Sequence, residues 1–177
     1  SAKYVCAPPL RKKEDQDCLW KGLADGTIQT VSTDHCSFTT EQKKLGEGDF
    51  TKIPGGMPGA ETRGTLIYTY GVDKGRITKE DMCRVLSENP AKLYGLYPRK
   101  GVIAPGSDAD LVIMRTGVED VITAKDQVQN VDYAPFEGTK VTGRVESVFL
   151  RGLQAVKDGK VVEEKKGEFL KRGKYAL

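Results

Sequence analysis

The residues best suited to chemistry follow a short strand-like run in the first third of the chain. Residues 27–31 (TIQTV) are rich in β-branched side chains, which favour a strand, and the polar residues 32–35 (STDH) come directly after them. Active sites of α/β barrels lie at the carboxyl ends of such strands. The Asp34 carboxylate could therefore bind a hard or borderline cation, or act as a general base toward a metal-bound water. An N-cap or turn role is the alternative at this position.

Two features near Asp34 each have a functional and a structural interpretation. His35 is the single histidine of the chain, which excludes a self-contained multi-histidine metal centre. It is either a metal ligand or a hydrogen-bonded structural residue. The loop at 54–59 (PGGMPG) could bring main-chain groups close to a substrate, because glycine permits close approach, or it could be a plain turn. The sequence motifs of phosphate-binding loops are absent.

Helices and one long loop would position these residues. Apolar side chains recur at helical spacing over 16–25, which predicts a helix there. The Gly- and Lys-rich stretch 41–63 predicts a long loop. Thr78 and Asp81 have the spacing of a capping box, which predicts that a helix begins at Thr78, and a proline in the first turn favours a second short helix over 89–93.

The second half of the chain has the pattern of β-strands. Apolar or alternating runs predict strands at 108–114, 145–150 and 160–162. Asp158-Gly159 is typical of a hairpin turn. The chain therefore divides near residue 96 into an α/β part and a β-rich part, and the charged stretch from Glu163 is predicted to be a surface tail.

Composition excludes several classes of function. The chain has 177 residues, of which 38% are hydrophobic and 30% charged, with a net charge of +3 and a mean hydropathy of -0.46. Its basic residues are scattered, which argues against a nucleic-acid surface. No apolar run approaches the roughly 18 residues of a membrane span, and no secretory signal is visible. Four widely spaced cysteines predict neither a disulfide framework nor a thiolate zinc site, so we expect reduced thiols and a cytoplasmic location.

Several motifs make the sequence similar to one enzyme family. The run TVSTDHCSF at 30–38 is strongly similar to the segment around the metal-binding aspartate of dihydropyrimidinases and hydantoinases, which are cyclic amidohydrolases. Other similar segments follow in the family's order and extend the resemblance over nearly the whole chain. They are CAPPLR at 6–11, EQK at 41–43, GDFTKIP at 48–54, NPAK at 89–92, GVIAPGSDADLVI at 101–113 and NVDYAPFEG at 130–138.

The resemblance implies an enzyme that hydrolyses a small cyclic amide or imide, such as dihydrouracil or a hydantoin, to an N-carbamoyl amino acid. In this family two zinc ions lie at the mouth of a TIM barrel, held by a carboxylated lysine, four histidines and one aspartate. Asp34 matches that aspartate. The resemblance therefore implies that Asp34 binds one metal ion and accepts the proton of the attacking water, a coherent pairing because two cations acidify water and polarise a carbonyl.

The resemblance also implies two positions that hold the substrate through main-chain groups. In the family one is a serine before the Pro-Pro-Leu-Arg motif, and the other is an asparagine after an Ile-Pro pair. These positions align with Ala7 and Gly55. Both side chains differ from the usual family residues, but main-chain contacts do not require a particular side chain.

The chain contains one member, Asp34, of the family's usual metal-ligand set. We therefore interpret it as the C-terminal portion of an α/β enzyme, inactive on its own. Residues 1–96 would form the last elements of the metal-dependent TIM (β/α)8 barrel. Residues 97–177 would form strands of a small composite β-sandwich domain and the C-terminal tail.

Two further expectations come from the resemblance. Family members are commonly homotetramers, so the region from Asp132 to Leu177 is a candidate interface. The alternative to an enzyme is a non-enzymatic dihydropyrimidinase-related scaffold protein. In those proteins the aspartate equivalent to Asp34 is typically replaced, so its presence here favours the enzyme.

Overall fold

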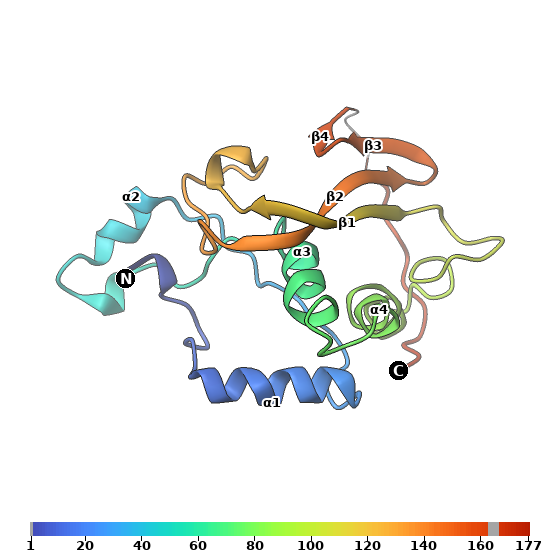
Figure 1. Ribbon diagram of the computed structural model, residues 1–177, viewed down its shortest axis with the longest axis horizontal. Helices are drawn as coiled ribbons and strands as arrows, with labels where there is room; N and C mark the ends of the chain where they lie inside the picture. The colour runs from blue at the N-terminus through green and yellow to red at the C-terminus, as the bar shows by residue number, and fades with distance from the viewer. Residues whose placement is uncertain (1, 163–166) are drawn as a thin grey trace.

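The computed structural model describes residues 2–162 and 167–177. In the described residues, the first half of the chain forms helices joined by loops, and the second half contains a four-stranded antiparallel sheet (Figure 1). Helix α3 (Arg63–Ile67) lies against strand β2 (Lys140–Leu150), and the long helix α1 (Lys13–Ala24) lies on the far side of α3 from the sheet.

The other elements are short. The remaining α-helices are α2 (Thr40–Lys43), α4 (Lys79–Cys83) and α5 (Asn89–Leu93), and two π-helical turns are η4 (Tyr68–Val72) and η5 (Arg84–Glu88). The 3-10 turns are η1 (Ala2–Tyr4), η2 (Lys44–Gly46), η3 (Phe50–Lys52) and η6 (Ala124–Asp126). The other strands are β1 (Leu111–Val121), β3 (Leu153–Lys157) and β4 (Lys160–Val161).

The predicted capping box at the start of α4 is confirmed. The Thr78 hydroxyl accepts a hydrogen bond from the Asp81 amide at 3.0 Å, and the Asp81 carboxylate accepts one from the Thr78 amide at 3.0 Å. This reciprocal pair satisfies two N–H groups at the helix end that have no partner within the helix. The helix then continues through η5 into α5, so the two predicted helices form one helical segment.

The sheet confirms the predicted strands and hairpin. Its order is β1-β2-β3-β4, and each pair is antiparallel. Asp158 and Gly159 join β3 to β4 with φ of 50° and 74°, and two positive φ values are what a type I′ hairpin turn requires.

The helix formed by α3 and η4 was not predicted. Its residues RGTLIYTYGV include two glycines and several β-branched or aromatic residues, all of them weak helix formers. Packing compensates for this weakness. Tyr68 is buried against Gly143 of β2, where an added Cβ would lie 2.4 Å from the Tyr68 ring, and the Thr69 hydroxyl accepts a hydrogen bond from the Thr142 amide at 3.1 Å.

The predicted strand at 27–31 is wrong. These residues form no strand: Thr27 and Ile28 lie in a bend, and the Val31 amide donates one main-chain hydrogen bond to the Val85 carbonyl at 3.1 Å. A strand is defined by a ladder to a neighbour, and parallel ladders are normally buried within a larger sheet. Among the described residues, the nearest approach to such a ladder is an isolated parallel bridge between His35 and Met57. The observed fold is thus a small α/β piece with an antiparallel sheet.

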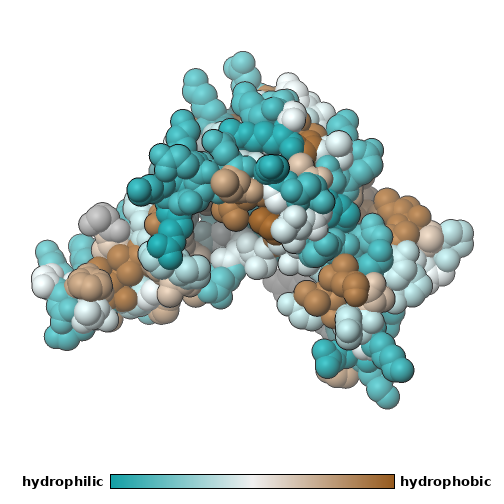
Figure 2. All heavy atoms as spheres, turned by 90° about the horizontal axis from the view of Figure 1, so that it is seen from below, coloured by the Kyte–Doolittle hydropathy of each residue, from teal (hydrophilic) through white to brown (hydrophobic). Residues whose placement is uncertain are grey.

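The core is small for a chain of this mass. Two clusters of buried residues hold it together: Leu23, Ile77 and Val85 between the helices, and Ile122, Ala134 and Val141 beside the sheet. The structure exposes 11971 Å² of surface, whereas a globular monomer of this mass exposes about 8500 Å². Large apolar side chains account for part of the excess, and Figure 2 shows them in separate patches on one face.

The C-terminal segment, as far as the structure describes it, is hydrogen-bonded to the end of helix α5. The predicted surface tail begins at Glu163, and its first four residues lie outside the described residues. The described remainder is mostly exposed, but Gly173 and Ala176 donate main-chain hydrogen bonds to residues at the end of α5. No helix in the described part of the chain is long and apolar enough to span a membrane.

Candidate functional site

Asp34 lies in a conformation that few side chains adopt. Its φ is 45°, in the left-handed region, which residues other than glycine seldom adopt and Asp adopts more readily than most. The residue is exposed, and its carboxylate makes no hydrogen bond or ion pair with any described residue. The N-cap interpretation is wrong, because the next helix, α2, is capped by Thr39. The Asp34 carboxylate is thus accessible to solvent and is not engaged by any described residue.

His35 fastens this segment to the Pro54–Gly59 loop. Its Nδ1 atom accepts hydrogen bonds from the Gly59 amide at 3.1 Å and the Ala60 amide at 3.2 Å. The Cys36 amide donates a hydrogen bond to the Met57 carbonyl at 3.1 Å, which joins the same two segments. The structural interpretation of His35 is therefore confirmed, and its role is to hold the loop beside Asp34.

Lys43 joins the same loop to the N-terminal segment. Its side chain is 1% exposed, and its ammonium donates to the carbonyls of Pro54 at 2.5 Å, Gly56 at 2.6 Å and Val5 at 3.1 Å. The Gly56 amide also donates to the Val5 carbonyl at 3.0 Å. Lys43 was not singled out from the sequence, although the family-like segment EQK at 41–43 includes Lys43 and ends before Lys44.

Ala7 and Gly55 lie on the two segments that Lys43 joins. Both residues are exposed, and their main-chain N–H and C=O groups form no hydrogen bond with the described residues. Gly55 stands between the two loop carbonyls that Lys43 binds, and Ala7 is two residues beyond Val5. The structure thus ties together the three segments that carry Asp34, Ala7 and Gly55, and the Asp34 carboxylate and the main-chain groups of Ala7 and Gly55 have no hydrogen-bond partner within the described residues.

A cavity of about 280 Å³ lies between the segment that precedes Asp34 and the Pro54–Gly59 loop. Its wall includes Ser32 and Thr33, which precede Asp34, together with the loop residues Met57, Pro58 and Gly59. Residues of α3 and the pair Pro135 and Phe136 complete it. Asp34, Ala7 and Gly55 do not themselves line this cavity, although Thr33 directly precedes Asp34. The lining is mainly apolar, as that of small-molecule sites usually is.

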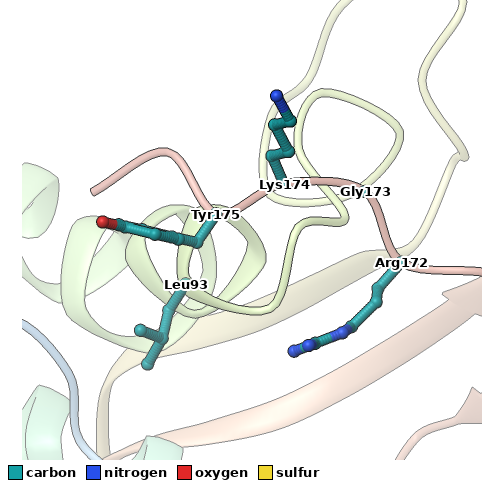
Figure 3. Close-up of a pocket in the computed structure, with 5 residues that line it drawn as sticks. All are labelled: Leu93, Arg172, Gly173, Lys174 and Tyr175. Carbon is teal, nitrogen blue, oxygen red and sulfur yellow. The ribbon is translucent and has the colours of Figure 1, made fainter.

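A second, more open cavity of about 790 Å³ lies where the C-terminal segment crosses α5 (Figure 3). It is lined by Leu93, Arg172, Gly173, Lys174 and Tyr175. Figure 3 shows the Arg172 and Lys174 side chains pointing in different directions, so they do not converge on one point. None of the candidate residues lines this cavity.

The electrostatics of the site centre on the buried lysine. Burial lowers the pKa of Lys43, and Cys36 and Cys6 act in the opposite direction.

Among the described residues, no three His, Cys, Asp or Glu side chains come close enough together to hold a metal ion. The residues of this chain alone therefore do not fit a dinuclear metal centre.

Comparison with known proteins assigns the chain to a family. A family model described as the amidohydrolase family matches residues 4–162, which is most of the sequence. This chain belongs to the amidohydrolase family. The recognition of hydantoinase-like motifs is thereby confirmed.

Relatives of this amidohydrolase chain include hydantoinases and a dihydropyrimidinase. The D-hydantoinase of Geobacillus stearothermophilus is 50% identical over 176 residues, which cover 98% of this chain and 37% of the relative. The structure of D-hydantoinase from a Bacillus sp. AR9 superposes with a TM-score of 0.96 at 47% identity, covering 99% of this chain and 39% of that one. Dihydropyrimidinase from Brevibacillus agri NCHU1002 gives a TM-score of 0.89 at 48% identity, covering 91% and 35%. The chain thus spans less than two fifths of the length of these relatives.

Proposed function

We propose that this chain is part of an enzyme that hydrolyses a cyclic amide or imide, a dihydropyrimidine or a hydantoin, to an N-carbamoyl amino acid. The names of its relatives support this substrate class. The observation that carries the proposal is Asp34: its carboxylate is exposed and has no hydrogen-bond or ion-pair partner among the described residues, and its segment is hydrogen-bonded to the loop that carries Gly55.

The proposed reaction assigns a task to each candidate residue. Water attacks a ring carbonyl, and Asp34 accepts the proton that the water loses. The ring C–N bond then breaks, the proton passes to the leaving nitrogen, and the carbonyl carbon becomes a carboxylic acid. Ala7 and Gly55 bind the ring through their main-chain N–H and C=O groups.

The proposal extends to the metal and to the rest of the protein. We propose that Asp34 is one ligand of a zinc pair and that the remaining ligands come from outside this sequence. By the same reasoning, residues 1–96 belong to the barrel and residues 97–177 to the β-rich domain. The large exposed area is consistent with further protein covering this chain.

A homotetramer located in the cytoplasm is also proposed, with residues 132–177 as a candidate interface. Within this region Phe169 is 90% exposed and Tyr175 is 72% exposed, as residues awaiting a partner would be. Gel filtration of the complete protein with and without this region tests the interface. An unchanged oligomer on its removal would reject it.

A chimera tests the activity directly. This sequence replaces the homologous segment of the Geobacillus stearothermophilus D-hydantoinase, to which it is 50% identical, and hydrolysis of hydantoin and dihydrouracil is measured. We expect an active chimera, and we expect Asp34→Ala and Asp34→Asn to lower kcat by at least about a hundredfold. Asp73→Asn is the control, because Asp73 is also an exposed aspartate and lies outside the site.

The chimera tests the enzymatic proposal and the role of Asp34 separately. A folded chimera that hydrolyses neither substrate overturns the enzymatic proposal and favours the scaffold-type relative. An active chimera in which Asp34→Ala leaves kcat unchanged keeps the enzyme but rejects the role of Asp34.

A further inference from the structure

The most unusual buried group in the chain is the Lys43 ammonium. A lysine is rarely fully buried unless its charge is paired. Within residues 2–162 and 167–177, Lys43 forms no ion pair; instead it meets three carbonyls and the Phe38 ring, whose centroid lies 5.6 Å away. An ammonium has three N–H donors, so three carbonyls satisfy it completely.

The three carbonyls come from two segments that are far apart in the sequence. Pro54 and Gly56 flank Gly55, and Val5 lies two residues before Ala7. The Gly56 amide and the Lys43 ammonium share the Val5 carbonyl as acceptor, so the two segments meet at that oxygen. The position of each free main-chain group thus depends on a carbonyl that Lys43 binds.

We infer that Lys43 is a positioning residue: its ammonium fixes the Val5–Ala7 and Pro54–Gly56 segments relative to each other, so that Ala7 and Gly55 together bind the substrate ring. This inference rests on the proposed function. Lys43 itself does not touch the substrate, because all three of its donors are used by the protein. Its effect on the reaction passes entirely through the two main-chain segments.

Removal of the ammonium leaves the loop carbonyls of Pro54 and Gly56 without their donor. Buried carbonyls without partners are costly, so the loop is expected to turn toward water and to move Gly55 away from Ala7. Main-chain contacts to the ring are made in the ground state and in the transition state alike. Their loss therefore raises KM and changes kcat little.

The test uses Lys43→Met in the active chimera described above. Methionine keeps the apolar stem of the side chain and removes its three donors. We expect KM for hydantoin to rise about tenfold or more while kcat stays within about threefold, because two substrate hydrogen bonds are weakened. The matched control is Lys44→Met: Lys44 is the next residue, it is exposed, and its ammonium forms no hydrogen bond or ion pair with a described residue.

A chemical rescue separates positioning from general support of the fold. Lys43→Ala removes the last three carbons and the nitrogen, which correspond to propylammonium. We expect millimolar propylammonium to lower the raised KM of Lys43→Ala and to leave the Lys44→Ala variant unchanged. Propanol, which matches the size but lacks the charge and two donors, should not restore KM.

Three results would overturn the inference. One is a KM of Lys43→Met within twofold of the unmodified chimera. Another is a loss confined to kcat. The third is failure of Lys43→Met, Lys43→Ala and the milder Lys43→Gln to give folded protein, since Lys43 would then serve folding alone. An inactive unmodified chimera instead counts against the proposed function, which keeps the two failures apart.

Discussion

Gly56 packs directly against Cys36. A Cβ built on Gly56 would lie 2.4 Å from the Cys36 Sγ atom and 2.5 Å from its Cβ, closer than any real contact. Gly56 also has φ of 125°, which other residues rarely adopt. The loop that carries Gly55 therefore approaches the Asp34 segment as closely as it does because residue 56 has no side chain.

The contrast between two adjacent glycines gives the first prediction. Gly56→Ala adds both a steric clash and a strained φ, and we expect it to destabilise the loop by about 3 kcal/mol or more. Gly55→Ala is the control, because an added Cβ at Gly55 meets nothing within 4 Å. In the chimera, Gly56→Ala should lose most hydantoin hydrolysis, and Gly55→Ala should keep it, because Gly55 acts through its main chain.

The measurements are steady-state kinetics and hydrogen exchange of the loop amides. If Gly56→Ala keeps normal KM and loop protection, the close packing is not needed for the site. If Gly55→Ala destroys binding without disturbing the loop, the contact at residue 55 depends on the absence of a side chain and not on the main chain alone.

The second prediction concerns which nitrogen of His35 matters. Its Nδ1 atom accepts the Gly59 and Ala60 amides, at 3.1 and 3.2 Å. The amide oxygen of Asn lies where Nδ1 does, whereas the longer Gln side chain reaches the place of Nε2. We expect His35→Asn to keep most activity, and His35→Gln and His35→Ala to lose about three- to tenfold, the value of one or two weak hydrogen bonds.

Activity assays of the three variants in the chimera check this order. An equal loss in His35→Asn and His35→Gln would show that Nδ1 is not what holds the loop. Greater loss in His35→Asn than in His35→Gln would assign the task to Nε2 instead.

Local sequence rules predicted the elements that local interactions stabilise. The capping box of Thr78 and Asp81 and the Asp158-Gly159 turn depend on residues at most three apart, and both are confirmed. The π-extended helix after Arg63 was missed, because its stability comes from Tyr68 packing on Gly143, 75 positions along the chain. Such a contact leaves no periodic signal in the sequence near either residue.

In the candidate site, too, a residue marked by its local sequence could be predicted, and a residue defined by distant contacts could not. Asp34 could be singled out because polar residues follow a β-branched run, although that run proved not to be a strand. Lys43 could not, because its partners Val5, Pro54 and Gly56 offer only main-chain carbonyls, which every residue has. Nothing in residue type marks a lysine that binds carbonyls, so this residue is visible in the structure alone.

A third prediction uses the cap of α4. Thr78→Ala removes the hydroxyl that accepts the Asp81 amide at 3.0 Å, a change that typically costs about 1 kcal/mol. Amides in the first turn of α4 should then exchange about fivefold faster in the chimera. Thr78→Ser, which keeps the hydroxyl, is the control. Equal exchange in Thr78→Ala and the unmodified chimera would contradict the prediction.

The last prediction is a pH dependence at the same helix end. Hydrogen bonds from Arg84 and from Thr78 lower the pKa of Asp81 to about 2 from its usual 3.8. The folded state therefore holds the charged carboxylate more tightly than the unfolded state does. The stabilisation is complete above about pH 4 and is lost as the pH falls toward 2.

Hydrogen exchange of α4, corrected for the intrinsic rate at each pH, measures this loss. Protection of the chimera should fall by up to about tenfold between pH 4 and pH 2, a value reduced from the full pKa shift because the pair is partly solvated. Asp81→Asn cannot titrate and should show a flat profile at a lower protection. Glu80→Gln, which removes the adjacent exposed carboxylate, should keep the slope. A slope that survives in Asp81→Asn would place the titrating group elsewhere.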